Sequence, residues 1–229
     1  MGYKKKKKSR SLKDITGSVK VDDTSLTKIN DLKLFISEND DNYIELINLE
    51  NCEYSISIFS YLNFELSIFK NCVFHSCDFE NSTFLNCEFI GCDFSGSKFN
   101  KAFFDKVNIK ECKFSGCSFI SAKLSNIIIF ESNFNYTSHF ECKIVDLKIN
   151  NTAYIEASFD ECELKNFNIK EVDFTKAEFF NTLLKDIDFS TSTIDNIKLS
   201  SNMMEIKGMI VDTYQAASLA IALGLIIKD

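Results

Sequence analysis

The chain has 229 residues with no proline and no tryptophan, and 23 of the residues are phenylalanine. Its length suits one domain or one short repeat array, and because it has no apolar run of about 18 residues, no transmembrane helix is expected. The net charge of −7 divides unevenly: residues 1–20 carry eight basic residues and one acidic residue, whereas the remainder carries 18 basic and 32 acidic residues. An acidic body argues against direct nucleic-acid binding and favours a basic protein partner.

The N-terminal part of the chain divides into a basic tail and a capping segment. Residues 1–20 contain the run Lys4 to Lys8 and no periodic apolar positions. They are predicted to be a disordered, solvated tail, with a nonspecific electrostatic anchor as the alternative. Residues 21–43 hold scattered apolar positions and are predicted to cover the open end of the fold that follows. No secretory signal is recognisable, and nine cysteines without one indicate a reducing, cytoplasmic location.

A five-residue period runs from about Ile44 to about Met204 without a slip, and it is clearest in residues 72–94. Of the 31 centre positions from 54 to 204, 17 are Phe and 13 are Tyr, Ile, Leu or Met, and the exception is His139. All nine cysteines lie two residues before a centre, at what we call the inner small position. Each unit therefore points one large and one small side chain inward and three outward. Such a unit buries its apolar side chain only by stacking.

Units such as CDFEN, CEFIG, CDFSG, CKFSG and VDFTK resemble pentapeptide repeats over roughly residues 42–206. The resemblance implies an all-β fold, a right-handed quadrilateral parallel β-helix with four units per coil. Independent support for four units per coil is that the inner small position becomes bulky at every fourth unit, while the centre two residues later mostly shrinks to Ile, as close packing requires. The bulky positions are Val107, Ile127, Leu147, Phe167 and Ile187. About eight coils are expected in the solenoid, which is assigned to residues 44–206.

Residues 207–229 are predicted to form a C-terminal α-helix that caps the solenoid and dimerises. Asp212 is a suitable N-cap, Gln215 completes a capping box, and Gly224 fits the position after the helix. The helix is apolar on most of its surface, which favours a symmetric homodimer in addition to the cap. The residues predicted to dimerise are Tyr214, Ala217, Leu219, Ala220, Ile221, Leu223 and Leu225.

No motif in the chain indicates catalysis, a cofactor or a metal. The cysteines are separated by whole numbers of repeat units, unlike the short pairs of zinc sites, and the frame places every thiol in the core as a small apolar group. His139 replaces a core Phe and is expected to mark a distortion, with Tyr136 or Phe140 filling the core instead. His75 falls on an outward position without an evident partner. We therefore predict a protein that is not an enzyme and has no catalytic residues.

Acidic residues concentrate on two adjacent faces of the expected coil. We number the faces by their centres: face 1 contains Tyr54 and Phe74, face 2 Phe59 and Phe79, face 3 Phe64 and Phe84, and face 4 Phe69 and Phe89. From residue 53 to residue 198, faces 1 and 2 carry 11 acidic and five basic residues, whereas faces 3 and 4 carry ten and nine. The surface is either a solubilising one or a partner-binding stripe. The partner-binding candidates are Asp78, Glu80, Asp93, Glu141, Glu156, Asp160, Glu161, Asp173 and Glu178.

A long acidic rod with an apolar C-terminal helix resembles the quinolone-resistance pentapeptide repeat proteins. The segment GMIVDTYQAASLAIALGLII, residues 208–227, is similar to their dimerisation segment. The resemblance implies a bacterial homodimer that mimics DNA and binds DNA gyrase or topoisomerase IV, either inhibiting the enzyme or protecting it from fluoroquinolones. The outward loops of many protective members are missing here. The second hypothesis is a non-catalytic structural or interaction scaffold with another protein partner.

Overall fold

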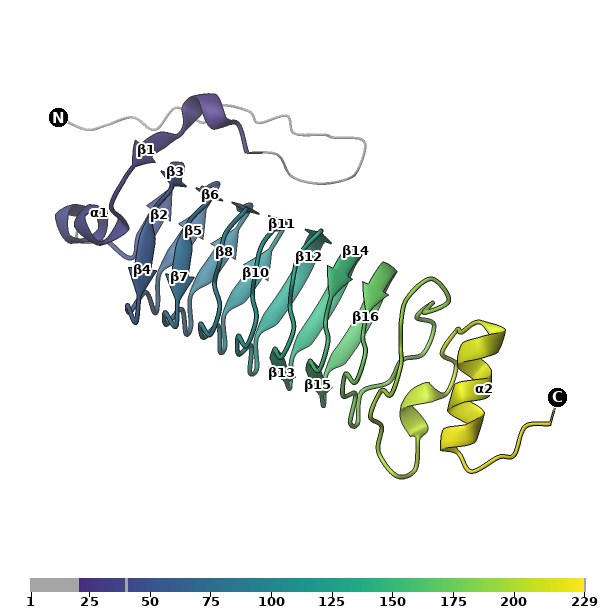
Figure 1. The fold of residues 1–229 in the computed structure, drawn as a ribbon. Helices are drawn as coiled ribbons and strands as arrows, with labels where there is room; N and C mark the ends of the chain where they lie inside the picture. Colours follow the sequence, from purple (N-terminus) through teal and green to yellow (C-terminus); the bar gives the residue numbers. More distant parts are fainter. Residues whose placement is uncertain (1–20, 40, 229) are drawn as a thin grey trace.

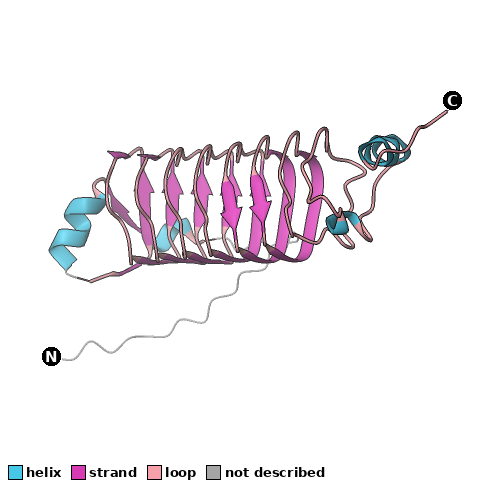
Figure 2. Ribbon diagram, turned by 90° about the horizontal axis from the view of Figure 1, so that it is seen from below, coloured by secondary structure: helices cyan, strands magenta, loops and turns pink. Residues whose placement is uncertain are grey.

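The chain forms a straight rod of stacked coils with a helix at each end (Figure 1). The structure is a computed structural model that describes residues 21–39 and 41–228. The predicted basic tail, residues 1–20, lies outside the described residues. Figure 2 shows the coils edge-on, with α1 (Leu32–Asn39) at one end of the stack and α2 (Thr213–Ala222) at the other.

The strands are short and fall on the predicted faces. Face 3 carries β2 (Tyr43–Glu45), β5 (Asn63–Glu65), β8 (Thr83–Leu85) and β10 (Phe103–Asp105). Face 4 carries β3 (Ile47–Glu50), β6 (Ile68–Lys70), β9 (Glu88–Ile90) and β11 (Asn108–Lys110). Three longer strands run across faces 3 and 4 together: β12 (Lys123–Phe130), β14 (Lys143–Ala153) and β16 (Glu163–Asp173). Face 1 carries β4 (Glu53–Ser55) and β7 (Val73–His75), and face 2 carries β13 (Ser138–Phe140) and β15 (Ser158–Asp160).

All the ladders are parallel, and their register is one whole coil of four units. Phe64 pairs with Phe84, and Phe84 pairs with Phe104, so equivalent units lie directly above one another. This register confirms the parallel solenoid with four units per coil. Seven strands stack on face 3, from β2 to β16, so the paired solenoid has about seven turns rather than the expected eight. The last coil, residues 182–199, keeps the five-residue frame but contains no strand.

The corners of the coil use left-handed backbone. Of the 31 positions that follow a centre by two residues between 46 and 196, 30 have a positive φ, and the exception is Thr191. This conformation costs an ordinary L-residue about 1–2 kcal/mol, so the stacked sheet enforces it at positions such as Ile56 and Glu131. At Gly91 a side chain would also require Asn71 to move, because a Cβ there would lie 2.6 Å from Asn71 Oδ1.

Aromatic side chains fill the interior as continuous stacks. Phe74 and Phe94 have centroids 5.0 Å apart with planes at 5°, and Phe79 and Phe99 are 5.1 Å apart at 3°. The nine cysteines are all buried and free, inside the core where the frame predicts them. Burial raises the pKa of Cys87 and that of Cys117 to about 12, so both thiols stay protonated at neutral pH.

His139 occupies the core itself, so the expectation that Tyr136 or Phe140 would replace it is wrong. Its ring is stacked between Phe119 and Phe159, with centroid distances of 4.9 and 4.6 Å. Tyr136 is 60% exposed. The imidazole is flat and fits the aromatic stack without a distortion of the coil. Its Nε2 lies 3.1 Å from the Thr137 hydroxyl, whereas Nδ1 is buried without a hydrogen-bond partner.

The N-terminal segment covers the first coil. After η1 (Asp23–Ser25), β1 (Thr27–Ile29) extends the sheet by pairing with β3. The backbone N–H of Leu32, the first residue of α1, donates to the Tyr54 hydroxyl at 2.6 Å. Tyr54 is the first aromatic centre of face 1, so this bond joins the cap to the end of an aromatic stack.

The C-terminal segment departs from the repeat earlier than the sequence indicates. Residues 204–206, expected within the solenoid, form η2 (Met204–Ile206) instead. The predicted capping box of α2 is present, with Asp212 and Gln215 bonded reciprocally, and Gly224 has a φ of 85°. The buried Gln215 side chain also donates to the carbonyls of Phe189 and Ser192, which fixes α2 over the last coil.

The isolated imidazole in the Phe stack gives a stability prediction. Replacing His139 with Phe restores the repeat and removes a buried, unpartnered Nδ1, which should raise the free energy of unfolding by about 1 kcal/mol. Urea denaturation followed by circular dichroism measures the change. Tyr136→Phe, at a position that is 60% exposed, serves as the control and should leave the midpoint unchanged, whereas a lower midpoint for His139→Phe would show that the cavity does not accept the larger ring.

Candidate protein-binding surface

Faces 1 and 2 present their polar side chains in fixed rows. Each unit turns three residues outward: the ones before and after the centre, and the corner residue. Because neighbouring parallel strands lie about 4.8 Å apart, equivalent residues of successive coils form a row with that spacing along the rod. The Phe stacks hold these rows rigidly, so the charge pattern of the surface follows directly from the sequence register.

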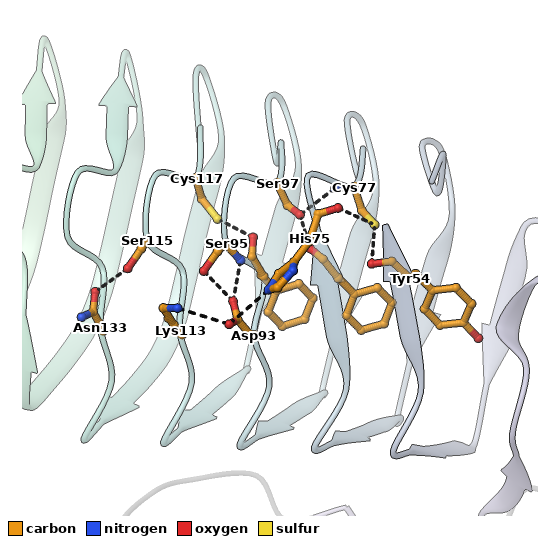
Figure 3. Close-up of polar contacts among 12 residues, drawn as sticks. Tyr54, His75, Cys77, Asp93, Ser95, Ser97, Lys113, Ser115, Cys117 and Asn133 are labelled. Carbon is orange, nitrogen blue, oxygen red and sulfur yellow. Dashed lines mark hydrogen bonds and ion pairs between the residues drawn. The ribbon is translucent and has the colours of Figure 1, made fainter. Parts of the chain in front are cut away.

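The most connected acidic residue of the surface is Asp93 on face 1 (Figure 3). Its carboxylate accepts from the Ser95 backbone N–H at 2.9 Å and from the Ser95 hydroxyl at 2.5 Å. His75 Nε2 lies 3.3 Å and Lys113 Nζ 3.4 Å from the other carboxylate oxygen, one from the coil before and one from the coil after. Partial burial works to raise the pKa of Asp93, but the bonds from Ser95 and His75 and the charge of Lys113 outweigh it, so the pKa lies below its ordinary value.

The turn that fixes Asp93 recurs along the rod. In this turn the side chain of the residue before a centre accepts a hydrogen bond from the backbone N–H of the residue after that centre. It occurs at Asp78, Asn133 and Asp173, with distances of 2.8 to 3.0 Å. A short side chain placed there bonds to its own turn, and this bond holds one oxygen of the side chain in a defined position. The sequence carried this signal in units such as CDFSG and VDFTK, where Asp comes directly before the central Phe.

The nine predicted acidic residues divide into two groups. Four form ion pairs with lysines of the next coil, with Nζ to carboxylate distances of 2.5 to 3.4 Å. These pairs are Glu80–Lys101, Asp93–Lys113, Glu156–Lys176 and Glu178–Lys198. The other five form no ion pair within the described part of the chain: Asp78, Glu141, Asp160, Glu161 and Asp173. Four of these five lie in the C-terminal half of the rod, so the free negative charge is concentrated there.

Corner residues enlarge the acidic surface beyond the prediction. Glu111, Glu131 and Glu171 belong to units whose centres lie on face 4, but together with Asp173 they line an open groove at the edge between faces 4 and 1. Numbering residues by face places a corner on one side only, although its side chain reaches both. The groove also contains Lys113, and Glu111 and Glu171 are each paired with the preceding lysine.

A protein-family model of pentapeptide repeats matches residues 87–126 in eight copies. The chain contains pentapeptide repeats. In the structure the same frame and the same corners extend on both sides of the matched segment, from Leu46 to Asn196.

Solved structures of known proteins align with most of this chain at low identity. A trypsin-treated form of QnrB1, a plasmid-mediated fluoroquinolone resistance protein, is 19% identical, with coverage of 82% of this chain and 92% of QnrB1 and a TM-score of 0.43. HetL, which is involved in heterocyst differentiation regulation in the cyanobacterium Nostoc sp. strain PCC 7120, is 14% identical, with coverage of 80% and 92% and a TM-score of 0.31. A comparison with curated proteins gave no match.

The residues predicted to dimerise lie on both sides of α2. Leu219 packs against the core of the last coil, and Ala217 and Ala220 are half-buried. The exposed members are Tyr214, Ile221, Leu223 and Leu225, with exposed fractions of 77, 62, 54 and 60%. None of the helices among the described residues is long and apolar enough to span a membrane. The described residues also include no group of three or more His, Cys, Asp or Glu side chains arranged to hold a metal ion.

The Asp93 network predicts a pH-dependent contribution to stability. Because the pKa of Asp93 in the folded chain is below its ordinary value of 3.8, its contribution is fully present above pH 3.8 and is lost as the pH falls through the lowered pKa. Asp93→Asn should therefore be less stable than the wild type at pH 7, and the two proteins should converge under strong acid. Denaturant titrations across this pH range measure the difference. A gap that stays constant down to full protonation would show that the ionised carboxylate contributes nothing.

Proposed function

We propose that faces 1 and 2 mimic DNA and bind the DNA-binding groove of a type II topoisomerase, either DNA gyrase or topoisomerase IV. The observation that supports this is the row of unpaired carboxylates on the C-terminal half of these faces, held by the stacked core. A surface of this kind complements a groove lined with Lys and Arg, and binding would weaken as the salt concentration rises. The proposed outcome is modulation of the enzyme or fluoroquinolone resistance.

The strength of the mimicry follows from the charge density. Faces 1 and 2 carry 11 acidic and five basic residues, a net charge of −6 between residues 53 and 198. Over seven turns of about 4.8 Å the rod has roughly one net negative charge on these faces per 6 Å, whereas duplex DNA has one per about 1.7 Å. The rod is therefore a weaker polyanion than DNA. Affinity for a DNA-binding groove would depend on where the few free carboxylates lie.

A supercoiling assay tests the proposal. The wild-type protein should inhibit purified gyrase, or protect it when a fluoroquinolone is present. Glu141→Lys/Glu161→Lys reverses two exposed, unpaired charges at one corner and should weaken the effect by about tenfold or more. Glu45→Lys/Asp146→Lys makes the same change of charge on face 3 and should leave the effect intact. No inhibition and no protection by the wild type at micromolar concentration would remove the proposal.

The second candidate is a scaffold that binds a different basic protein. The observation that favours it is the neutralisation of four of the nine predicted acidic residues by lysines in neighbouring coils. The fold hosts several functions, so the solenoid alone does not select the partner. A scaffold would retain charge-dependent binding to its own partner while having no effect on supercoiling, which separates the two candidates.

We also propose that α2 joins two copies of the chain. Ile221 and Leu223 are more than half exposed and lie beside the exposed Leu225, so a second helix would cover them. Ile221→Lys should convert the dimer to a monomer in sedimentation velocity. Leu219 is unsuitable for this test because it holds α2 on the last coil.

The exposed polar position Thr213 provides the control for the dimer. Thr213→Lys adds the same charge to α2 about 80° around the helix from Ile221, away from the face that contains Tyr214 and Ile221, and it should leave the dimer intact. If the wild-type protein sediments as a monomer at high concentration, the exposed face of α2 has another role.

A further inference from the structure

The last coil is bonded to the coil before it on only two of its four faces. Along the rod, the backbone N–H of each centre donates to the next coil, as Phe79 does to the Lys98 carbonyl at 2.8 Å. This pattern continues to the last coil on face 1, where Phe174 N–H donates to Thr193, and on face 2, where Phe179 N–H donates to Lys198. On faces 3 and 4 it stops. Figure 1 shows the chain leaving the stack of strands after β16.

The edge of β16 that faces the last coil is unpaired. β16 pairs with β14, and within the described residues no backbone hydrogen bond joins it to residues 183–190. Leu164 and Ile169, which are centres of β16, are only half-buried, whereas the equivalent Ile144 and Ile149 are 1 and 2% exposed. The groups on this edge without a backbone partner are the N–H of Leu164, Asn166, Ile169 and Glu171 and the C=O of Cys162 and Phe167.

Residues 183–190 carry the complementary groups in the repeat register. By the register of one coil, the carbonyls of Leu183 and Asp188 would accept from the N–H groups of Leu164 and Ile169. On its other side the same segment is already bonded to the C-terminal cap. The N–H groups of Leu184, Asp186 and Phe189 donate to Glu205, Gly208 and Ile210, each at 2.9 Å. These bonds use the opposite edge of the segment, so the segment and the cap can move together toward β16.

The size of Phe167 explains why the coil is open here. It occupies the inner small position of face 4, where the side chain grows from Val107 through Ile127 and Leu147 to Phe167. Phe167 is 5% exposed and lies edge-on against Phe159, with centroids 6.3 Å apart. A side chain this large at an inner small position overfills the space between two coils. The one corner of the frame without a positive φ, at Thr191, lies where the open segment rejoins the rod.

We propose that the last coil and the C-terminal cap form a hinged clasp, which closes when residues 183–190 dock on the free edge of β16. The hinge consists of the two ends of the segment that remain bonded. Thr182 Oγ1 accepts from Cys162 N–H at 2.9 Å, and Ser192 Oγ accepts from Val172 N–H at 3.2 Å. Closure pairs the exposed edge, buries Leu164 and Ile169, and changes the angle at which α2 leaves the rod. An unpaired strand edge is a template for other chains, so the clasp also protects the rod from edge-to-edge association.

A pair of engineered cysteines in the full-length chain tests closure. Lys165→Cys/Lys185→Cys places thiols at equivalent outward positions of the two coils. They should form a disulfide in native buffer with diamide as the oxidant, identified by peptide mass mapping. Val145→Cys/Lys165→Cys is the matched control, because these positions are paired in β14 and β16, and it should react faster. If the control pair reacts and the test pair does not, the clasp does not close.

Amide hydrogen exchange measures how often the edge is free. The N–H groups of Leu164 and Ile169 should exchange faster than those of Ile144 and Ile149, and the Lys165→Cys/Lys185→Cys disulfide should slow them. Equal protection in the unlinked chain would mean that the coil is always closed, which overturns the hinge. Protection of Leu164 and Ile169 that rises with protein concentration would assign the edge to a second copy and also overturn the proposal.

The role of Phe167 is tested by a smaller side chain. Phe167→Leu should shift the clasp toward the closed state, which is seen as several-fold faster disulfide formation at positions 165 and 185 and slower exchange at Ile169. Phe174→Leu removes the same atoms from the same coil on face 1, and it should not accelerate disulfide formation. Equal acceleration by both variants would show general loosening of the core and no specific effect of Phe167.

Discussion

The whole structure depends on stacking one large side chain per five-residue unit. A single unit is too short to bury its own Phe, so each ring is buried by the rings of the coils above and below it. The ring centroid of Phe79 lies 5.3 Å from that of Phe59 and 5.1 Å from that of Phe99, and the same stacking contact repeats along the rod. Two consequences follow. The outward residues are free to vary without loss of the core. The two ends of the ring stacks need separate covers: α1 is bonded to the first coil through Leu32 N–H and the Tyr54 hydroxyl, and α2 is bonded to the last coil through the Gln215 side chain and the Phe189 carbonyl.

The inner small positions add a second connection between coils. The Ser97 hydroxyl donates to the Phe74 carbonyl at 2.6 Å and accepts from the Cys77 N–H at 2.9 Å, so one side chain joins neighbouring coils through two backbone groups. Face 4 loses this connection where the inner small position becomes bulky and apolar, from Val107 onward. There the coils are held by the backbone ladder and by packing alone. The rod comes apart on both sides of the largest of these side chains, Phe167, where no hydroxyl or thiol bridges the coils, and the coils join again at the hydroxyls of Thr182 and Ser192.

The sequence predicts this fold unusually well because one period sets the register, the interior and the surface together. It does not predict which outward residues interact, since the Asp93 network combines side chains from three coils and depends on rotamers. It also misleads at the last coil. The frame continues through residues 183–190, and Phe167 reads as volume compensation, because a repeat pattern records side-chain size and contains no information on whether two coils are hydrogen-bonded. His139 is similar: the pattern marks it as an exception but not as a ring that simply joins the stack.

The acidic surface is best understood as rigid carboxylates with replaceable partners. Asp93 and Asp173 are fixed by their own turns, whereas the lysines that pair with the acidic residues are long, exposed side chains such as Lys113 and Lys176. Ion pairs at this exposure contribute about 0–1 kcal/mol each, so a partner's Arg or Lys can displace them at little cost. These ion pairs therefore weaken the negative electrostatic potential that the rod produces at a distance, but they do little to prevent a partner's Arg or Lys from reaching the carboxylates. Such a surface would attract a basic partner more weakly than DNA does, yet still present it with carboxylates in defined positions.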